Sequence, residues 1–203
     1  LSTGEGLEPL FRRMMFDPDL RLFPWQRTHL WFLEERRVAR EDPRSSYARM
    51  RDTLIMPAGI PLHQVHAIPG DQPKADLVLE EQLRKVLSGR LGGQGCLDGA
   101  ILEVGADGRI AALFPGEEST VDSSRWVRLT GDTAGDAPGW ISMTLPVINR
   151  ARMIAVVAQG EAVGRALHQL ADRDLAPRDF PAAGLRSDEG LLKWYLDESA
   201  ARV

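Results

Sequence analysis

The sequence has only one cysteine, Cys96, among its 203 residues, and it has no long apolar run. A single cysteine excludes an intrachain disulfide framework and any metal site built from several cysteines. It is also typical of a protein in the reducing cytoplasm. No stretch approaches the roughly 20 apolar residues of a membrane span, and no charged-then-apolar leader is present. We therefore expect a cytoplasmic protein with no membrane partner.

A strong charge of either sign is also missing. Lys and Arg number 25, Asp and Glu number 29, and the formal net charge is -4. The basic residues are interleaved with acidic ones, which excludes the basic surface typical of nucleic-acid binding. Hydrophobic residues make up 43% and charged residues 27% of the chain, the balance of a globular protein. The length fits one domain, which we predict to span residues 1–203.

Signals for a bound metal or cofactor are absent as well. The histidines have no metal-ligand spacing, and the glycine-rich turn Gly105–Gly108 lacks the G-x-G-x-x-G pattern of dinucleotide sites. We expect neither a metal nor a cofactor. His29 lies within an apolar run, so we expect it to be packed in the core.

What the chain does contain is an alternation of strand-like and helix-like segments. Continuous or alternating apolar runs predict strands in Thr28–Leu33, Gly99–Val104, Trp140–Leu145 and Met153–Ala158, while helical spacing predicts helices in Ala75–Leu87 and Glu161–Asp172. This order predicts a mostly parallel sheet covered on both faces. Gly89–Gly95 is expected to be a flexible break, and the polar segment Glu117–Gly139 a long surface excursion.

Five blocks, in chain order, carry a family resemblance. They are LSTGEGL at Leu1–Leu7, WFLEERRVAREDPRSS at Trp31–Ser46, DGAILEVGADGRIAALFP at Asp98–Pro115, ISMTLPVINRAR at Ile141–Arg152 and PAAGLRSDEGLLKWYLDESAA at Pro181–Ala201. Together they resemble the 6-phosphogluconolactonase family, a branch of the glucosamine-6-phosphate isomerase-like fold. The resemblance implies an α/β fold with a three-layer, mostly parallel Rossmann-like sheet and helices on both faces. It also implies a helix and a strand before the first block. We expect that the sequence is incomplete there, with completion of the domain by another chain as the alternative.

The resemblance implies a chemistry and identifies its candidate residues. The family opens a sugar-phosphate δ-lactone by attack of water, and the base is thought to be the histidine of its D-G-H motif. Here that position is Arg109, whose guanidinium stays protonated and cannot act as a general base. Arg109, Asp107 and Glu35 are the candidate catalytic positions. An ion pair of Arg109 with Glu103 or Asp107 is the expected structural role.

The resemblance also assigns the binding of the sugar phosphate. The candidate substrate-binding residues are Ser2, Gly4, Arg36, Gly105, Asn149 and Arg152. Arg36 has a structural alternative, as a partner of Glu34 or Glu35. Residues that depart from the family pattern in the same motifs are Thr3, Glu5, Ser46, Glu103, Trp140 and Val163. A carboxylate near a phosphate site repels the phosphate, so these departures predict weakened substrate handling.

Three functions remain open on this reading. The first is a 6-phosphogluconolactonase-like protein of sugar-phosphate metabolism with lost or weak hydrolase activity and a binding or regulatory role. The second is an active lactonase, or a related hydrolase, with a relocated base such as Glu103 or Glu35. The third is a structural subunit of a larger assembly. The expected partners are a sugar phosphate or another anion, and possible protein partners include a second copy of the chain.

Overall fold

The computed structural model describes residues 1–20, 22–88, 95–131 and 138–202. Its helices are α1 (Glu8–Phe16), α2 (Ser46–Met50), α3 (Ala75–Ser88), α4 (Leu145–Ile148), α5 (Glu161–Asp172) and α6 (Glu198–Ala201). Its strands are β1 (Leu30–Trp31), β2 (Glu34–Arg36), β3 (Val65–His66), β4 (Ala100–Glu103), β5 (Val127–Thr130), β6 (Trp140–Met143), β7 (Met153–Ala158) and β8 (Leu191–Leu196). Almost all of the predicted break at Gly89–Gly95 lies outside the described residues.

The strands form two parallel sheets and one antiparallel sheet. β1 pairs with β3 in parallel, and β4, β7 and β8 form a parallel sheet in that order. The third sheet, β2-β6-β5, is antiparallel. The α/β class with parallel sheets and helices is therefore confirmed. The antiparallel sheet was not predicted, because a short charged strand such as β2, with sequence EER, gives no strand signal.

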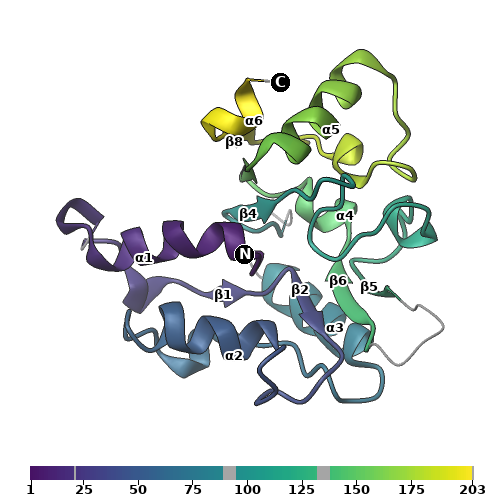
Figure 1. The fold of residues 1–203 in the computed structure, drawn as a ribbon. Coiled ribbons are helices and arrows are strands. Elements are labelled where there is room, and N and C mark those ends of the chain that lie inside the picture. The colour runs from purple at the N-terminus through teal and green to yellow at the C-terminus, as the bar shows by residue number, and fades with distance from the viewer. Residues whose placement is uncertain (21, 89–94, 132–137, 203) are drawn as a thin grey trace.

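The first residues of the chain join the parallel sheets. The Ser2 N–H donates to the Ile101 carbonyl in β4 at 2.8 Å, and the Leu33 N–H, just after β1, donates to the Leu1 carbonyl at 3.0 Å. Figure 1 accordingly shows the N-terminus near the middle of the molecule, with β4 on one side and β1 on the other. In the same view β1 runs between α1 and α2. The loop that follows Ser2 is thereby held at the carboxyl end of β4.

The longest predicted elements are found where the sequence placed them. β7 is a continuous apolar run, MIAVVA, whose central residues are buried, as expected for an interior parallel strand. α5 keeps the predicted bounds, and α3 buries Leu79, Leu83 and Leu87 at a spacing of four residues. None of the helices in the described ranges is long and apolar enough to cross a membrane.

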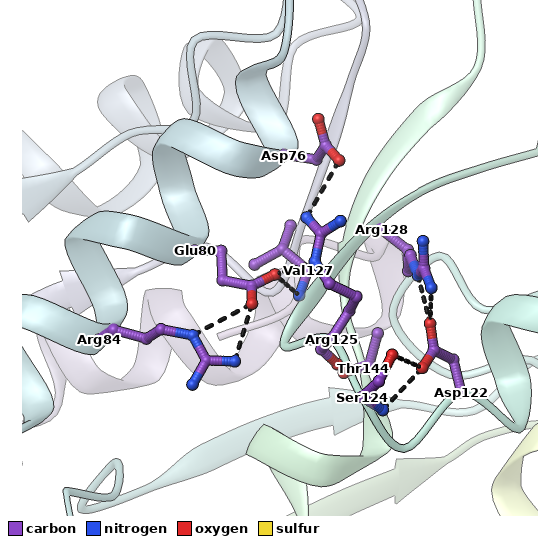
Figure 2. A network of polar contacts seen from close by, with 9 residues as sticks. All are labelled: Asp76, Glu80, Arg84, Asp122, Ser124, Arg125, Val127, Arg128 and Thr144. Carbon is purple, nitrogen blue, oxygen red and sulfur yellow. Dashed lines mark hydrogen bonds and ion pairs between the residues drawn. The ribbon is translucent and has the colours of Figure 1, made fainter.

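The segment Glu117–Gly139 is not merely a surface excursion, because it contributes β5 to the antiparallel sheet. Val127 is fully buried, and a polar network anchors this strand to α3 (Figure 2). Arg125 donates to Glu80 at 2.6 Å and to Asp76 at 3.3 Å, while Arg84 binds the other oxygen of Glu80 at 2.8 Å. β5 was not predicted because the segment around it is polar, and the ion pairs that hold it against α3 form only in the folded chain. Residues 132–137 of the segment lie outside the described ranges.

His29 is exposed, so the expectation of a core histidine is wrong. Its Nδ1 lies 2.8 Å from Nε2 of His66, and the His66 ring stacks on Trp31 with a centroid distance of 3.8 Å. Burial, together with the neighbouring His29, lowers the pKa of His66 to about 4. His66 is therefore uncharged at neutral pH, and its ring covers Trp31 on the β1-β3 sheet.

Candidate active-site cleft

A cleft of about 490 Å³ opens where the first loop, the end of β2, α2 and the end of β4 meet. Its walls combine glycine backbone, carboxylates, guanidinium groups and two aromatic rings. The lining residues are Ser2, Thr3, Gly4, Glu5, Glu34, Arg36, Arg44, Ser46, Arg49, Glu103, Val104, Gly105, Arg109, Ala111, Phe114 and Trp140. A concave site with convergent polar groups at the carboxyl end of parallel strands is the usual place for a ligand in an α/β protein.

Four arginines line this cleft, and Arg36 lies among the other three. Burial lowers the pKa of Arg36, and the charges of Arg44, Arg49 and Arg109 lower it further. An arginine nevertheless stays protonated at any working pH. The Arg36 guanidinium also stacks over the Trp140 ring at 4.1 Å, which fixes its plane. The cluster is a concentration of positive charge that suits an anion with several oxygens.

Glu34 lines the cleft and is almost completely buried. Its Oε1 accepts hydrogen bonds from the Ser2 hydroxyl and the Thr3 N–H, both at 2.7 Å. Its Oε2 is buried and has no hydrogen-bond partner among the described residues. Burial raises the pKa of Glu34, although the bonds from Ser2 and Thr3 oppose the shift. Thr3 also donates to the Ser46 hydroxyl at 2.9 Å, which links the loop to α2.

Glu103 is the last residue of β4, and its carboxylate reaches the glycines of the first loop. The Gly6 N–H donates to this carboxylate. A Cβ added to Gly4 would overlap Oε2 of Glu103, and one added to Gly6 would overlap Oε1. Burial raises the pKa of Glu103, while the Gly6 bond and the charge of Arg109 oppose the shift. A half-buried carboxyl with a raised pKa, next to a cleft, is a candidate acid or base.

Arg109 follows a tight turn at the end of β4. Gly108 has a φ of +81°, and its Cα faces the Phe180 ring so closely that a side chain would not fit. Asp107 stabilises the turn, because its Oδ1 accepts from the Arg109 N–H at 3.1 Å. Its Oδ2 lies 3.8 Å from the Arg109 guanidinium, so the expected ion pair forms with Asp107.

The predicted site residues divide into two groups. Five line the cleft, namely Arg109, Ser2, Gly4, Arg36 and Gly105. The other four, Asp107, Glu35, Asn149 and Arg152, do not line it, and each has a visible structural partner. Roles in binding or catalysis remain predictions for both groups.

Glu35 lies in a block that resembles the family motif, but its carboxylate is used by neighbouring backbone and hydroxyl groups. Its Oε1 accepts from the Ser46 N–H at 2.6 Å and from the Arg36 N–H at 2.8 Å. Its Oε2 accepts from the Tyr47 N–H and from the Ser45 hydroxyl, both at 3.0 Å. Both oxygens therefore hold the start of α2, where backbone N–H groups lack helical partners. The geometry favours Glu103, not Glu35, as the carboxylate available for chemistry.

Asn149 and Arg152 lie outside the cleft. The Asn149 amide donates to the Gly184 carbonyl at 2.9 Å and accepts from the Arg186 N–H at 3.2 Å, so it joins two loops. Arg152 forms an exposed ion pair with Asp98 at 3.4 Å. Val163, which departs from the family pattern, packs in the core.

Two of the cleft arginines, Arg44 and Arg49, are not predicted as site residues from the sequence. Arg44 forms a bidentate pair with Asp42, and Arg49 donates to the Thr3 carbonyl at 3.1 Å. Arg49 lies on α2 four residues after the Ser45 N-cap. The only sequence signal is that Arg44 lies within the D-P-R-S-S turn and Arg49 shortly after it, which does not show where their side chains point.

The α/β fold and its arginine-lined cleft define the class of protein, and comparison with known proteins gives the family. The family model described as glucosamine-6-phosphate isomerases/6-phosphogluconolactonase matches residues 1–194, and the chain belongs to this family. The 6-phosphogluconolactonase of Haemophilus influenzae is 29% identical over 205 residues, with 100% of this chain and 85% of that protein covered.

Two further comparisons support the assignment. The human GDH/6PGL endoplasmic bifunctional protein is 32% identical over 183 residues, which cover 88% of this chain but 23% of that longer protein. The crystal structure of a devB protein superposes with a TM-score of 0.85 at 26% identity, covering 99% of this chain and 84% of that one. These relatives do not support the expectation that the chain has lost its activity or taken a regulatory role. The expected protein partner or homo-oligomer stays a prediction.

Proposed function

We propose that this chain hydrolyses a phosphorylated sugar lactone, with Glu103 as the base. The observation that carries the proposal is the combination, in one cleft, of four arginines and a half-buried carboxylate with a raised pKa. The arginines supply the charge that a phosphate ester requires. The carboxylate supplies the proton acceptor that Arg109 cannot be. The family relation supports the reaction class, because named relatives are 6-phosphogluconolactonases.

The lining groups divide the work of binding. Arg36, Arg44 and Arg49 hold the phosphate through charge-assisted hydrogen bonds. Stacking on Trp140 keeps the Arg36 guanidinium in one orientation before the ligand arrives, which lowers the entropy lost on binding. The lactone ring then lies toward Glu103 and Arg109, which line the same cleft.

The hydrolytic step follows from these positions. Glu103 takes a proton from water, and the water oxygen attacks the lactone carbonyl carbon. The resulting oxyanion is stabilised by the Arg109 guanidinium, since fixed positive charge is most effective where negative charge develops. Collapse of the intermediate breaks the bond to the ring oxygen, which receives the proton from Glu103. The product is the open-chain sugar acid, and Glu103 is again a carboxylate.

Turnover of 6-phosphogluconolactone by the purified chain tests this proposal. Hydrolysis well above the spontaneous rate is expected, and the same preparation should be far slower on the lactone without its phosphate. Arg40→Ala is a suitable control, because Arg40 stacks on Tyr47 outside the cleft. A rate no higher than that of the buffer alone would disprove the proposed function.

A further inference from the structure

In the first loop of the chain, ahead of α1, two backbone N–H groups are already occupied by carboxylates of the chain itself. A glycine-containing loop ahead of a helix presents N–H groups that attract anions. In this protein the Thr3 N–H donates to Glu34 at 2.7 Å, and the Gly6 N–H donates to Glu103. Two carboxylates of the chain thus take the places in which an external anion would accept these bonds.

The space beside the loop is filled as well. The two carboxylate oxygens of Glu103 lie so close to Gly4 and Gly6 that a side chain on either glycine would require this carboxylate to move. The side-chain oxygen of Gln159 also closes on Gly6. A phosphate group could enter this pocket only if the Glu103 carboxylate left it.

The carboxylates that line the cleft beside the first loop also disfavour a phosphate there. Glu5 and Glu34 line the cleft together with Glu103. A like charge nearby disfavours a second anion, so the loop side of the cleft repels a phosphate dianion. The same cleft contains positively charged donors on Arg36, Arg44 and Arg49. These groups lie close enough together that the charges of the other cleft arginines lower the pKa of Arg36.

We infer that Glu103 is a specificity-determining residue. Its carboxylate fills the anion pocket of the first loop, so that the phosphate of the ligand is bound by the guanidinium groups of Arg36, Arg44 and Arg49. The inference rests on the proposed function only in assuming that the ligand carries a phosphate. It gives Glu103 a binding role that is separate from its role as a base.

Calorimetric titration of the purified chain with inorganic phosphate at pH 8 tests the inference without any turnover. Glu103→Gly empties the pocket, and phosphate should then bind on the order of tenfold more tightly, because a like charge and a blocking group are both removed. Glu5→Gln is the matched control, since it removes one negative charge from the same cleft but leaves the pocket filled. Its effect should stay below about threefold, as expected for an exposed charge.

The dependence of phosphate binding on Arg36 gives a second measurement. Arg36→Ala should weaken phosphate binding about tenfold in the wild-type background, but less than about threefold beside Glu103→Gly, where the loop donors bind the phosphate instead. Circular dichroism verifies that each variant is folded. Glu103→Gln keeps the side-chain volume, so its gain in phosphate affinity should be smaller than that of Glu103→Gly.

Two results would overturn the inference. One is an affinity of Glu103→Gly equal to that of the wild type, and the other is an equal gain from Glu5→Gln. An absence of lactone hydrolysis, by contrast, would defeat the proposed function and leave these binding results unchanged.

Discussion

β2 and the end of β4 both bring glutamates to the region of the cleft, but these glutamates have different surroundings. In β2, Glu35 has four hydrogen-bond donors on its two oxygens, and Glu34 has its Oε1 bound to the first loop. At the end of β4, Glu103 is half-buried, lines the cleft and accepts a hydrogen bond from the Gly6 N–H; burial raises its pKa, as it raises the pKa of Glu34 and of Glu35.

We infer from this difference that the number of hydrogen-bond donors around a carboxylate indicates whether it stabilises the fold or takes part in chemistry. A carboxylate saturated by backbone N–H groups stabilises the loops that supply those groups. A carboxylate with fewer donors and partial access to solvent can still exchange a proton with a ligand or with water. By this criterion the two glutamates of β2 stabilise the walls of the cleft, and Arg36 of the same strand contributes positive charge. Glu103 of β4 is the reactive group.

The largest effect is expected from Glu103→Gln. The variant keeps the shape of the side chain but cannot accept a proton, so kcat should fall about 10²–10⁴-fold, the usual contribution of a general base. Steady-state hydrolysis of 6-phosphogluconolactone, corrected for the spontaneous reaction, measures this change. A kcat within threefold of the wild type would remove Glu103 from the mechanism.

The next effect is expected from Arg36→Ala. Loss of a charge-assisted hydrogen bond costs about 1.5–3 kcal/mol, so KM should rise roughly 10- to 100-fold with a smaller change in kcat. Arg44→Ala should have a weaker effect, because Asp42 already pairs with that guanidinium. Equal KM values for Arg36→Ala and the Arg40→Ala control would show that the cluster does not hold the phosphate.

Glu35→Gln should change stability and leave the chemistry intact. An amide can accept on only one side, so N–H groups at the start of α2 lose partners, at a cost of about 1–3 kcal/mol in the free energy of unfolding. Denaturant unfolding measures the loss, and kcat per folded molecule should stay within about twofold of the wild type. If kcat fell as far as in Glu103→Gln, the division between β2 and β4 would be wrong.

The smallest effect is expected from Arg109→His. An imidazole at this position has the pKa of a base, but it stands beside Glu103, and the cationic partner of the oxyanion is lost. We therefore expect kcat to change by less than about threefold, since gain and loss oppose each other. A large increase in turnover would show that the histidine alone had been missing.

Much of the fold could be predicted from the sequence, and less of the cleft. β7 and α5 were located because a continuous apolar run and a 3.6-residue period are local signals. β5 was missed because its polar surroundings hide it and ion pairs with α3 hold it (Figure 2).

In the cleft, the motif positions of Ser2, Gly4, Arg36, Gly105 and Arg109 indicated the correct region. The direction of a side chain is decided by tertiary packing, however, and the sequence does not show it. The sequence therefore does not distinguish Glu35 from Glu103 as a replacement base, and it does not indicate that Arg44 and Arg49 line the cleft. The contact of Glu103 with Gly4 and Gly6 joins residues about a hundred positions apart and appears only in the folded chain.

The pH dependence of kcat, measured at saturating lactone for the wild type and Glu103→Gln, tests the central claim most directly. Burial raises the pKa of Glu103 above its ordinary 4.5, and only the deprotonated form can accept a proton. The wild-type kcat should therefore be low in acid, rise through this raised pKa and stay level at higher pH, because Arg109 remains protonated throughout. We predict that the acid limb disappears in Glu103→Gln. An unchanged acid limb in that variant would contradict the assignment of Glu103 as the base.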